Sequence, residues 1–154
     1  MDEMLRELYQ EVILDHGKKP RNFRLPDDAT CKAEGNNPLC GDRLTIYAKV
    51  SDNKVLEDIA FQGRGCAISL ASASMMTDIA KGKTISQAQD LFNLFHKLCT
   101  GEEEDLASEE FSEEIEKLKV MSGVRQFPMR GKCATLAWHA MNAAMTGEND
   151  ATTE

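Results

Sequence analysis

The chain lacks a long hydrophobic run. Its 154 residues contain no window of the roughly 18 apolar residues that a membrane-spanning helix needs. The N-terminus, MDEMLRELYQ, is acidic and amphipathic, so it also lacks the basic start and apolar centre of a secretory signal. These absences predict a cytoplasmic protein that does not bind membranes, in a compartment where thiols stay reduced.

The chain also does not have the even number of cysteines that complete disulfide pairing needs. Five cysteines fit poorly with a closed set of disulfide bonds. A chain of this length can bury a hydrophobic core without cross-links. The cysteines therefore point to metal binding or thiol chemistry.

The chain has no surplus of basic residues, and its net charge is −8. The acidity lies in two segments: residues 100–120 hold nine acids and two lysines, and residues 148–154 hold three acids. The remainder holds 14 acids and 16 bases and is nearly neutral. A nucleic-acid-binding protein has a basic stripe instead, so the composition argues against a nucleic-acid partner.

Hydrophobic periodicity predicts an antiparallel hairpin among several helices. Residues 43–51 alternate apolar and polar side chains, residues 54–63 do so less cleanly, and Asp52-Asn53 between them is a turn signal. The expected product is a small antiparallel sheet with one buried face. Helices are predicted over 1–17, 66–82, 84–99 and 133–147, with a short one in the acidic segment.

Local signals refine these elements. Thr84 and Gln87 have the spacing of a capping box at the start of a helix. The polar segment 148–154 is expected to be a disordered tail on a single domain. The apolar face of the first helix is expected to contain Met4, Leu5, Leu8 and Val12.

Three cysteines occupy positions that suit metal binding. Cys40 follows a turn and lies two residues before the carboxylate of Asp42. Cys66 and Cys133 each begin a predicted helix, where free backbone N–H groups and the helix dipole lower the pKa of a thiol. Basic residues that would stabilise thiolates further lie close in sequence, at Arg43, Arg64, Arg130 and Lys132.

These three thiols and the Asp42 carboxylate make four possible ligands for a tetrahedral ion such as Zn²⁺. Their spacing matches no compact zinc-finger pattern, so each cysteine could instead be a small buried apolar residue. The carboxylate and the two helix starts favour a shared site. Cys31 and Cys99, in a predicted strand and late in a predicted helix, are expected to be packing residues.

Four stretches of the sequence carry a family resemblance: LYQEVILDHGKKPRNF, NNPLCGD, FQGRGCAIS and RGKCATLAWHA. They are spread over nearly the whole chain. On these motifs the chain resembles the SufU/IscU-type proteins of iron–sulfur cluster assembly, also described as NifU N-terminal-like.

The resemblance implies an α+β fold in one domain over residues 1–147, with a three-stranded antiparallel sheet and helices packed on one face. It implies that Cys40, Asp42, Cys66 and Cys133 form one metal site. It also implies partnership with a pyridoxal-phosphate cysteine desulfurase of the SufS-like kind, which hands over sulfur as a persulfide. Downstream iron–sulfur assembly machinery would then receive the product.

Within this family the chain is more similar to the SufU side. IscU-type members have a histidine where this chain has Lys132, and a chaperone-binding LPPVK-type motif where this chain has QFPMRGK. The acidic stretch at about 100–120 resembles the insertion that marks SufU-type members.

The SufU resemblance implies a zinc-dependent sulfurtransferase. Zinc keeps bound thiols deprotonated and has no redox chemistry of its own. We assign Cys40, on a glycine-flanked loop, as the sulfur acceptor, because its thiolate can attack a persulfide by thiol exchange. Arg125, Arg130 and Lys132 are supporting residues that would help to dock the partner or steady the anionic persulfide.

Two alternatives remain at this point. The same ligands could hold a [2Fe–2S] cluster that is assembled here and passed to apo-proteins, since thiolates suit iron–sulfur clusters as well as zinc. The chain could also be a purely structural zinc module that binds other proteins, although an aspartate ligand on a loop argues against a closed structural site.

Overall fold

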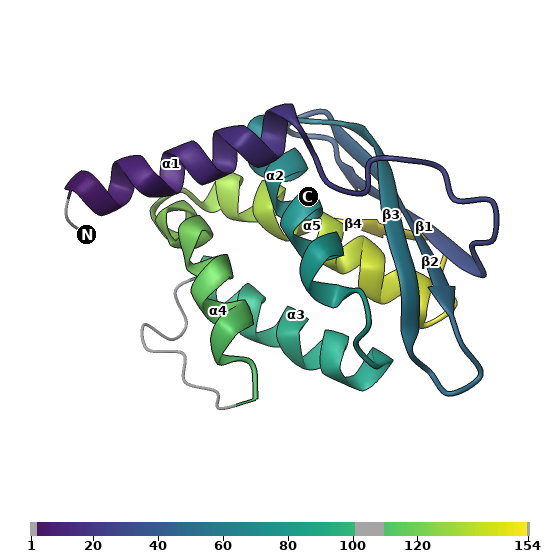
Figure 1. Cartoon of the computed structure of the whole chain (residues 1–154). Coiled ribbons are helices and arrows are strands. Elements are labelled where there is room, and N and C mark those ends of the chain that lie inside the picture. The colour runs from purple at the N-terminus through teal and green to yellow at the C-terminus, as the bar shows by residue number, and fades with distance from the viewer. Residues whose placement is uncertain (1–2, 101–109, 154) are drawn as a thin grey trace.

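The computed structural model describes residues 3–100 and 110–153, apart from the side chain of Arg125 (Figure 1). The predicted acidic insertion therefore lies partly outside the described residues. In chain order the elements are α1 (Glu3–Lys18), β1 (Cys31–Asn37), β2 (Asp42–Val50), β3 (Leu56–Arg64), α2 (Ala67–Ala80), α3 (Ile85–Thr100), α4 (Ser112–Leu118), the 3-10 helix η1 (Lys119–Gln126), α5 (Pro128–Met145) and β4 (Asp150–Thr152).

The molecule has two layers, a twisted sheet and a group of helices on one of its faces (Figure 1). The order of strands in the sheet is β3-β2-β1-β4. Strands β1, β2 and β3 pair antiparallel, as expected. The architecture confirms the predicted α+β fold class.

The sheet has a fourth strand that the sequence did not predict. Residues 150–152 lie in the tail that was expected to be disordered, and they pair parallel with β1 as β4. The next residue, Thr153, is buried, and its hydroxyl donates to the backbone oxygen of Lys132 at 3.1 Å. The pairing uses the otherwise open edge of β1, so the chain near its C-terminus is held against both the sheet and α5.

The core lies between the sheet and α2, α3 and α5. Alternation along β2 turns Leu44 and Ile46 inward, where both are fully buried. On the helix side, the Trp138 ring stacks on Phe95 with 4.8 Å between ring centroids. This packing fixes α5 across β1 and β2, which positions the residues discussed below.

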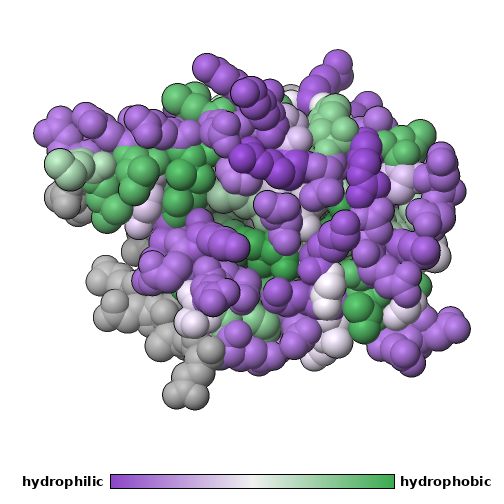
Figure 2. All heavy atoms as spheres, viewed as in Figure 1, coloured by the Kyte–Doolittle hydropathy of each residue, from purple (hydrophilic) through white to green (hydrophobic). Residues whose placement is uncertain are grey.

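Helix α1 covers α2 but extends past the rest of the body (Figure 1). Tyr9, Val12 and Ile13 pack against the core, whereas Leu8, expected on the apolar face, is exposed. The first turns of α1 have little to pack against, so the apolar face extends beyond the contact surface. Figure 2 shows apolar side chains gathered along this helix, and the exposed large ones are Met4, Leu5, Leu8 and Leu14.

The predicted capping box is present at the start of α3. The backbone N–H of Thr84 donates to Oε1 of Gln87 at 2.9 Å, and the N–H of Gln87 donates to Oγ1 of Thr84 at 3.1 Å. In the described part of the chain, no helix is both long enough and apolar enough to cross a membrane.

Candidate metal centre

Cys40, Asp42 and Cys133 meet at one end of the sheet. One ligand atom from each lies within 4.8 Å of the other two. The two sulfurs are 3.4 Å apart, although 93 residues separate them in sequence. The predicted convergence of distant thiols and a neighbouring carboxylate is therefore present for three of the four residues.

The β1–β2 hairpin places the first two of these residues. Asn37 and Asp42 are the last register pair of the hairpin, and residues 38–41 form the loop between them. Gly41 has φ +72°, a conformation that glycine adopts without steric cost. This residue lets the chain reverse between an exposed Cys40 and a fully buried Asp42.

Cys66 joins the site through its backbone. Its N–H donates to Oδ1 of Asp42 at 2.9 Å. As expected, it stands at the start of a helix, where its sulfur caps α2 by accepting from the backbone N–H of Ser69 at 3.5 Å. The Cys66 sulfur is not part of the 4.8 Å group, so this residue is adjacent to the cluster but its thiol is turned toward the helix end.

Cys133 lies deeper than the sequence predicted. Helix α5 begins at Pro128, so Cys133 is in the second turn and not at the free N-terminus. The expectation of a lowered thiol pKa at this position is therefore wrong. Burial raises the pKa of the Cys133 thiol, and the neighbouring Asp42, Cys40 and Cys66 raise it further.

The donor set fits a soft or borderline divalent cation. Oδ2 of Asp42 is buried and has no hydrogen-bond partner among the described residues. A buried carboxylate oxygen beside two sulfurs carries a large desolvation cost unless a cation is bound. Thiolate and carboxylate ligands in a tetrahedral set are typical of zinc, and thiolates also suit iron–sulfur clusters.

Asn37 was not singled out in the sequence, but it touches the site. It is fully buried, and its Nδ2 lies 3.8 Å from Sγ of Cys133 as a hydrogen-bond donor. Its position three residues before Cys40 in NNPLCGD is the only sequence signal that could have drawn attention to it.

Some of the basic residues that were expected to stabilise thiolates also have other neighbours. Arg43 pairs with Glu34 at 2.9 Å, so its charge is already partly balanced. Arg130 is exposed in the first turn of α5, with its guanidinium 5.8 Å from the centre of the Phe127 ring. The side chain of Arg125 lies outside what the structure describes.

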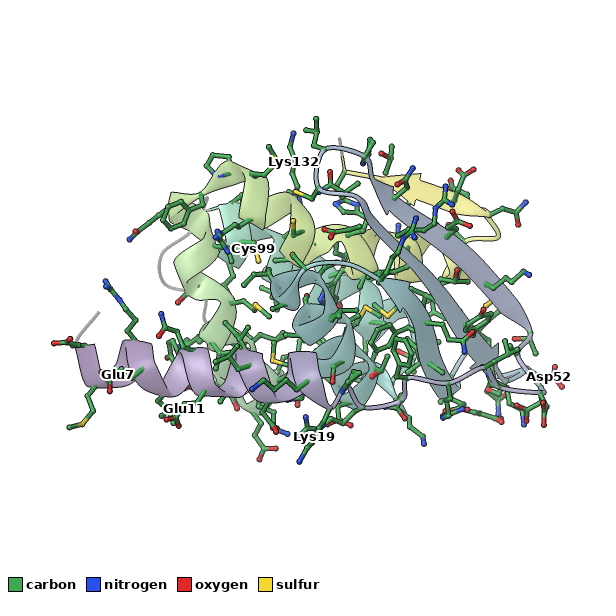
Figure 3. The ribbon with its side chains drawn as sticks, turned by 90° about the horizontal axis from the view of Figure 1, so that it is seen from above. Glu7, Glu11, Lys19, Asp52, Cys99 and Lys132 are labelled. Atoms are coloured by element: carbon green, nitrogen blue, oxygen red, sulfur yellow. The ribbon has the colours of Figure 1, made fainter. Side chains whose placement is uncertain are left out.

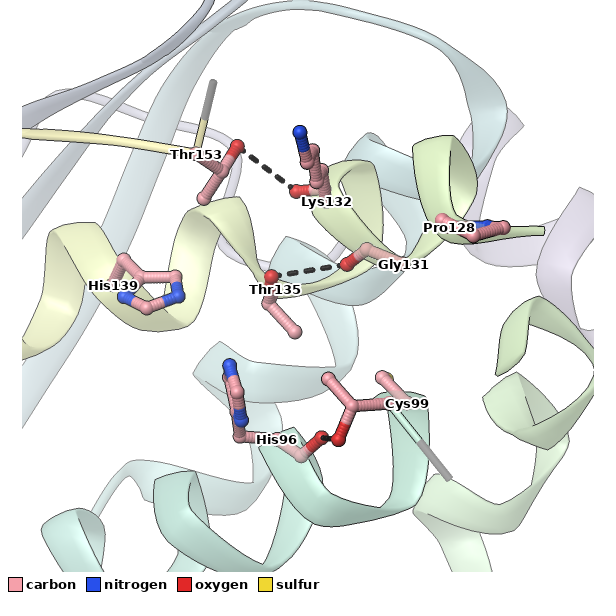
Figure 4. Close-up of a pocket in the computed structure, with 9 residues that line it drawn as sticks. His96, Cys99, Pro128, Gly131, Lys132, Thr135, His139 and Thr153 are labelled. Atoms are coloured by element: carbon pink, nitrogen blue, oxygen red, sulfur yellow. Dashed lines mark hydrogen bonds between the residues drawn. The ribbon is translucent and has the colours of Figure 1, made fainter. Parts of the chain in front are cut away.

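Lys132 lies beside a cavity of about 380 Å³ between α3 and α5 (Figure 4). His96 and His139 line the same cavity, with 5.7 Å between their ring centroids. The backbone oxygen of Lys132 is held by Thr153. Viewed from above, Lys132 lies on the opposite side of the molecule from the acidic residues Glu7 and Glu11 of α1 (Figure 3).

The remaining two cysteines stand apart from the cluster, as predicted. Cys99 is buried in the core beside α5. Cys31 is half-buried in β1, where burial raises the pKa of its thiol. Large apolar side chains are exposed on the segments that carry Cys40 and Cys133, namely Leu39, Phe127 and Met129.

Fold and site together define a class: a small α+β protein in which two cysteines and an aspartate, placed to bind a metal ion, meet where the β1–β2 loop approaches α5. The chain belongs to the family of the NifU-like N-terminal domain, whose model matches residues 8–117.

Relatives in this family are similar over almost the whole chain. The zinc-dependent sulfurtransferase SufU of Bacillus subtilis is 41% identical over 94% of this chain and 93% of its own length. The iron–sulfur cluster assembly scaffold protein IscU of Streptococcus pyogenes is 39% identical over 92% of this chain and 84% of its own. A crystal structure of a candidate cluster assembly scaffold of the SUF system from Fervidobacterium islandicum is 30% identical, with a TM-score of 0.79, over 94% of this chain and 99% of the other.

Proposed function

We propose that this protein acts in iron–sulfur cluster assembly as a zinc-dependent sulfur acceptor, taking persulfide sulfur from a cysteine desulfurase. The observation that carries the proposal is the cluster of Cys40, Asp42 and Cys133 with Cys40 exposed to solvent. The relative named as a zinc-dependent sulfurtransferase supports the choice of metal and of reaction.

The proposed ligands are Cys40, Asp42, Cys66 and Cys133. In this proposal the side chain of Cys66 turns away from the end of α2, where its sulfur accepts from Ser69, and toward the cluster. This rotation is open to it because the side chain is exposed and its N–H already contacts Asp42. When bound, zinc would keep the thiols ionised without taking part in redox chemistry.

Cys40 is the proposed acceptor because it is the exposed sulfur of the clustered pair and lies on the hairpin loop. Its thiolate attacks the outer sulfur of the desulfurase persulfide. One S–S bond forms at Cys40, the S–S bond within the desulfurase persulfide breaks, and the desulfurase cysteine leaves as a thiolate. No net oxidation or reduction occurs.

The surface around Cys40 suits contact with a partner protein. Leu39 adjoins the acceptor in sequence, and Phe127 and Met129 lie at the start of the helix that carries Cys133. Exposed apolar residues beside a reactive group are typical of an interaction surface. A SufS-like desulfurase would dock here, with Arg130, Lys132 and Arg125 as supporting charges, and later assembly proteins would receive the sulfur.

The experiment is sulfur transfer from a cysteine desulfurase supplied with L-cysteine, measured as persulfide on this protein by mass spectrometry. Cys40→Ala is expected to abolish labelling and stimulation of the desulfurase. The matched control is Cys31→Ala, which changes a half-buried cysteine outside the cluster and should keep both. Full transfer by Cys40→Ala would rule out the acceptor assignment.

A second function, a scaffold for a [2Fe–2S] cluster, is favoured by the IscU relatives that match the chain. The same donors would serve, since thiolates bind both centres. Metal analysis of protein purified without oxygen separates the two. About one zinc per chain with little iron supports the sulfur acceptor, whereas iron with inorganic sulfide supports the scaffold.

A further inference from the structure

A buried amide faces the buried sulfur of the site. Asn37 ends β1 and is fully buried, and its Nδ2 lies 3.8 Å from Sγ of Cys133. Cys133 is itself buried, so it has little access to water. The amide is therefore a protein donor to a sulfur that has few other sources of hydrogen bonds.

We infer that Asn37 is a positioning residue of the metal site, which donates an N–H···S hydrogen bond to the Cys133 thiolate when a metal is bound. The inference rests on the proposed function, because it requires Cys133 to be a ligand. Outer hydrogen bonds of this kind orient metal ligands and affect metal affinity.

The other end of the same amide supports this role. Oδ1 of Asn37 is buried without a hydrogen-bond partner among the described residues. A buried unpaired carbonyl oxygen destabilises a fold, and an apolar side chain of similar size avoids that loss. Fold stability alone would therefore favour leucine here, so the benefit of asparagine lies in the N–H group that it directs at the sulfur.

The hydrogen bond also gives the two clustered sulfurs different roles. Cys133 is fixed by a rigid helix and by Asn37, whereas Cys40 lies on the exposed loop. Asn37 thus keeps one ligand in place while the other is free to react. Loss of the bond should weaken metal binding without removing any ligand.

The test compares Asn37→Leu with wild type and with Asn36→Leu as the matched control. Asn36 is the preceding residue of β1, so its side chain points to the other face of the sheet. We expect Asn37→Leu to bind Zn²⁺ about 10-fold more weakly in competition with a chromophoric chelator. With Co²⁺ in place of zinc, the thiolate-to-metal charge-transfer band should move to longer wavelength, because a sulfur without a donor holds its lone pairs less tightly. Asn36→Leu should match wild type in both measurements.

A purely structural role predicts a different pattern. It would lower the melting temperature of metal-free Asn37→Leu and leave the zinc affinity and the cobalt band unchanged, which would overturn the inference. The inference instead expects the metal-free variant to melt at or above the wild-type temperature. If wild-type protein binds neither Zn²⁺ nor Co²⁺, the proposed function fails first, and the inference fails with it.

A measurement on unmodified protein guards against a variant that does not fold. In wild-type protein loaded with ¹¹³Cd²⁺, NMR should detect coupling between the metal and the side-chain amide protons of Asn37, transmitted through the sulfur and the hydrogen bond. Coupling to this amide supports the inference. Bound ¹¹³Cd²⁺ without such coupling overturns it.

Discussion

The backbone N–H of Cys66 donates a hydrogen bond of 2.9 Å to Oδ1 of Asp42, which ties the cap of α2 to the first residue of β2. The two oxygens of this carboxylate thus have different environments. Oδ1 accepts the hydrogen bond from Cys66, and Oδ2 is buried without a hydrogen-bond partner among the described residues. Asp42 connects the architecture of the fold to the proposed ligand set.

Substitutions of Asp42 should separate its hydrogen bond with Cys66 from its proposed role as a metal ligand. Asp42→Asn keeps an oxygen for the Cys66 N–H but removes the second oxygen and the charge. We expect zinc affinity to fall at least about 10-fold, because even residues outside the ligand set affect affinity by that much. Metal-free protein should keep its stability or gain some, since a buried charge without a counter-ion is removed.

The variant Asp42→Ala is compared with Asp42→Asn in zinc affinity and in stability. It loses the bond to Cys66 as well, which should cost about 1 kcal/mol of unfolding free energy relative to Asp42→Asn. Chelator competition and urea unfolding measure the two quantities. Wild-type zinc affinity in Asp42→Asn would exclude the carboxylate from the ligand set.

Thiol accessibility tests whether Cys66 turns toward the metal. In metal-free protein, Cys40 and Cys66 are exposed and should react fastest with iodoacetamide. Zinc should slow both, because a bound thiolate is a poorer nucleophile toward the reagent, while Cys31 should react at the same slow rate with and without metal. Peptide mass spectrometry over a time course measures each rate. Unchanged labelling of Cys66 on addition of zinc would leave that residue outside the ligand set.

Protonation of His16 should lower the free energy of unfolding when the pH is made mildly acidic. Its Nδ1 lies 2.7 Å from Oγ of Ser74, which also accepts from the backbone N–H of Arg21. Because this oxygen already accepts one hydrogen bond, we expect the serine hydroxyl to donate to Nδ1 of a neutral His16. Burial lowers the pKa of His16 below its usual 6.5 in the folded protein, so as the pH falls through 6.5 the unfolded chain takes up the proton first and stability is lost.

His16→Asn should reduce this pH dependence, since asparagine can keep the contact with Ser74 but does not titrate. Urea midpoints of metal-free protein at about pH 7.5 and 5.5 measure the difference. Part of the dependence should remain, because burial also lowers the pKa of His139. An equal loss of stability in variant and wild type would contradict the assignment.

Gly63 near the end of β3 should not tolerate a side chain. Its φ is +142°, and a Cβ atom there would lie 2.2 Å from the backbone oxygen of Arg43 on the neighbouring strand. We expect Gly63→Ala to cost at least about 2 kcal/mol of unfolding free energy. At Gly123 a Cβ would meet nothing within 4 Å, so Gly123→Ala should change stability by less than about 0.5 kcal/mol. Similar melting temperatures for the two variants would disprove the steric argument.

Local signals in the sequence predicted the elements well. The capping box of Thr84 and Gln87 placed the start of α3, because both of its hydrogen bonds form within one turn. Alternation predicted the paired strands β2 and β3. These features depend on neighbouring residues alone, so they can be read from the chain.

The errors arose where distant contacts or a misread boundary decided the structure. The last helix was predicted to begin at Cys133, but proline suits the first turn of a helix, and α5 begins at Pro128. That shift moved Cys133 from a helix end into the interior. Strand β4 exists because the edge of β1 is available to it, and no pattern within residues 150–152 indicates this pairing.

The sequence distance between the two clustered sulfurs has a consequence for biosynthesis. Cys40 is translated 93 residues before Cys133, a delay of roughly 5 to 20 s at ordinary ribosomal speeds. For that interval the nascent polypeptide carries an unshielded nucleophile without its partner on α5. The proposed ligand set can therefore be complete only after the ribosome has added Cys133.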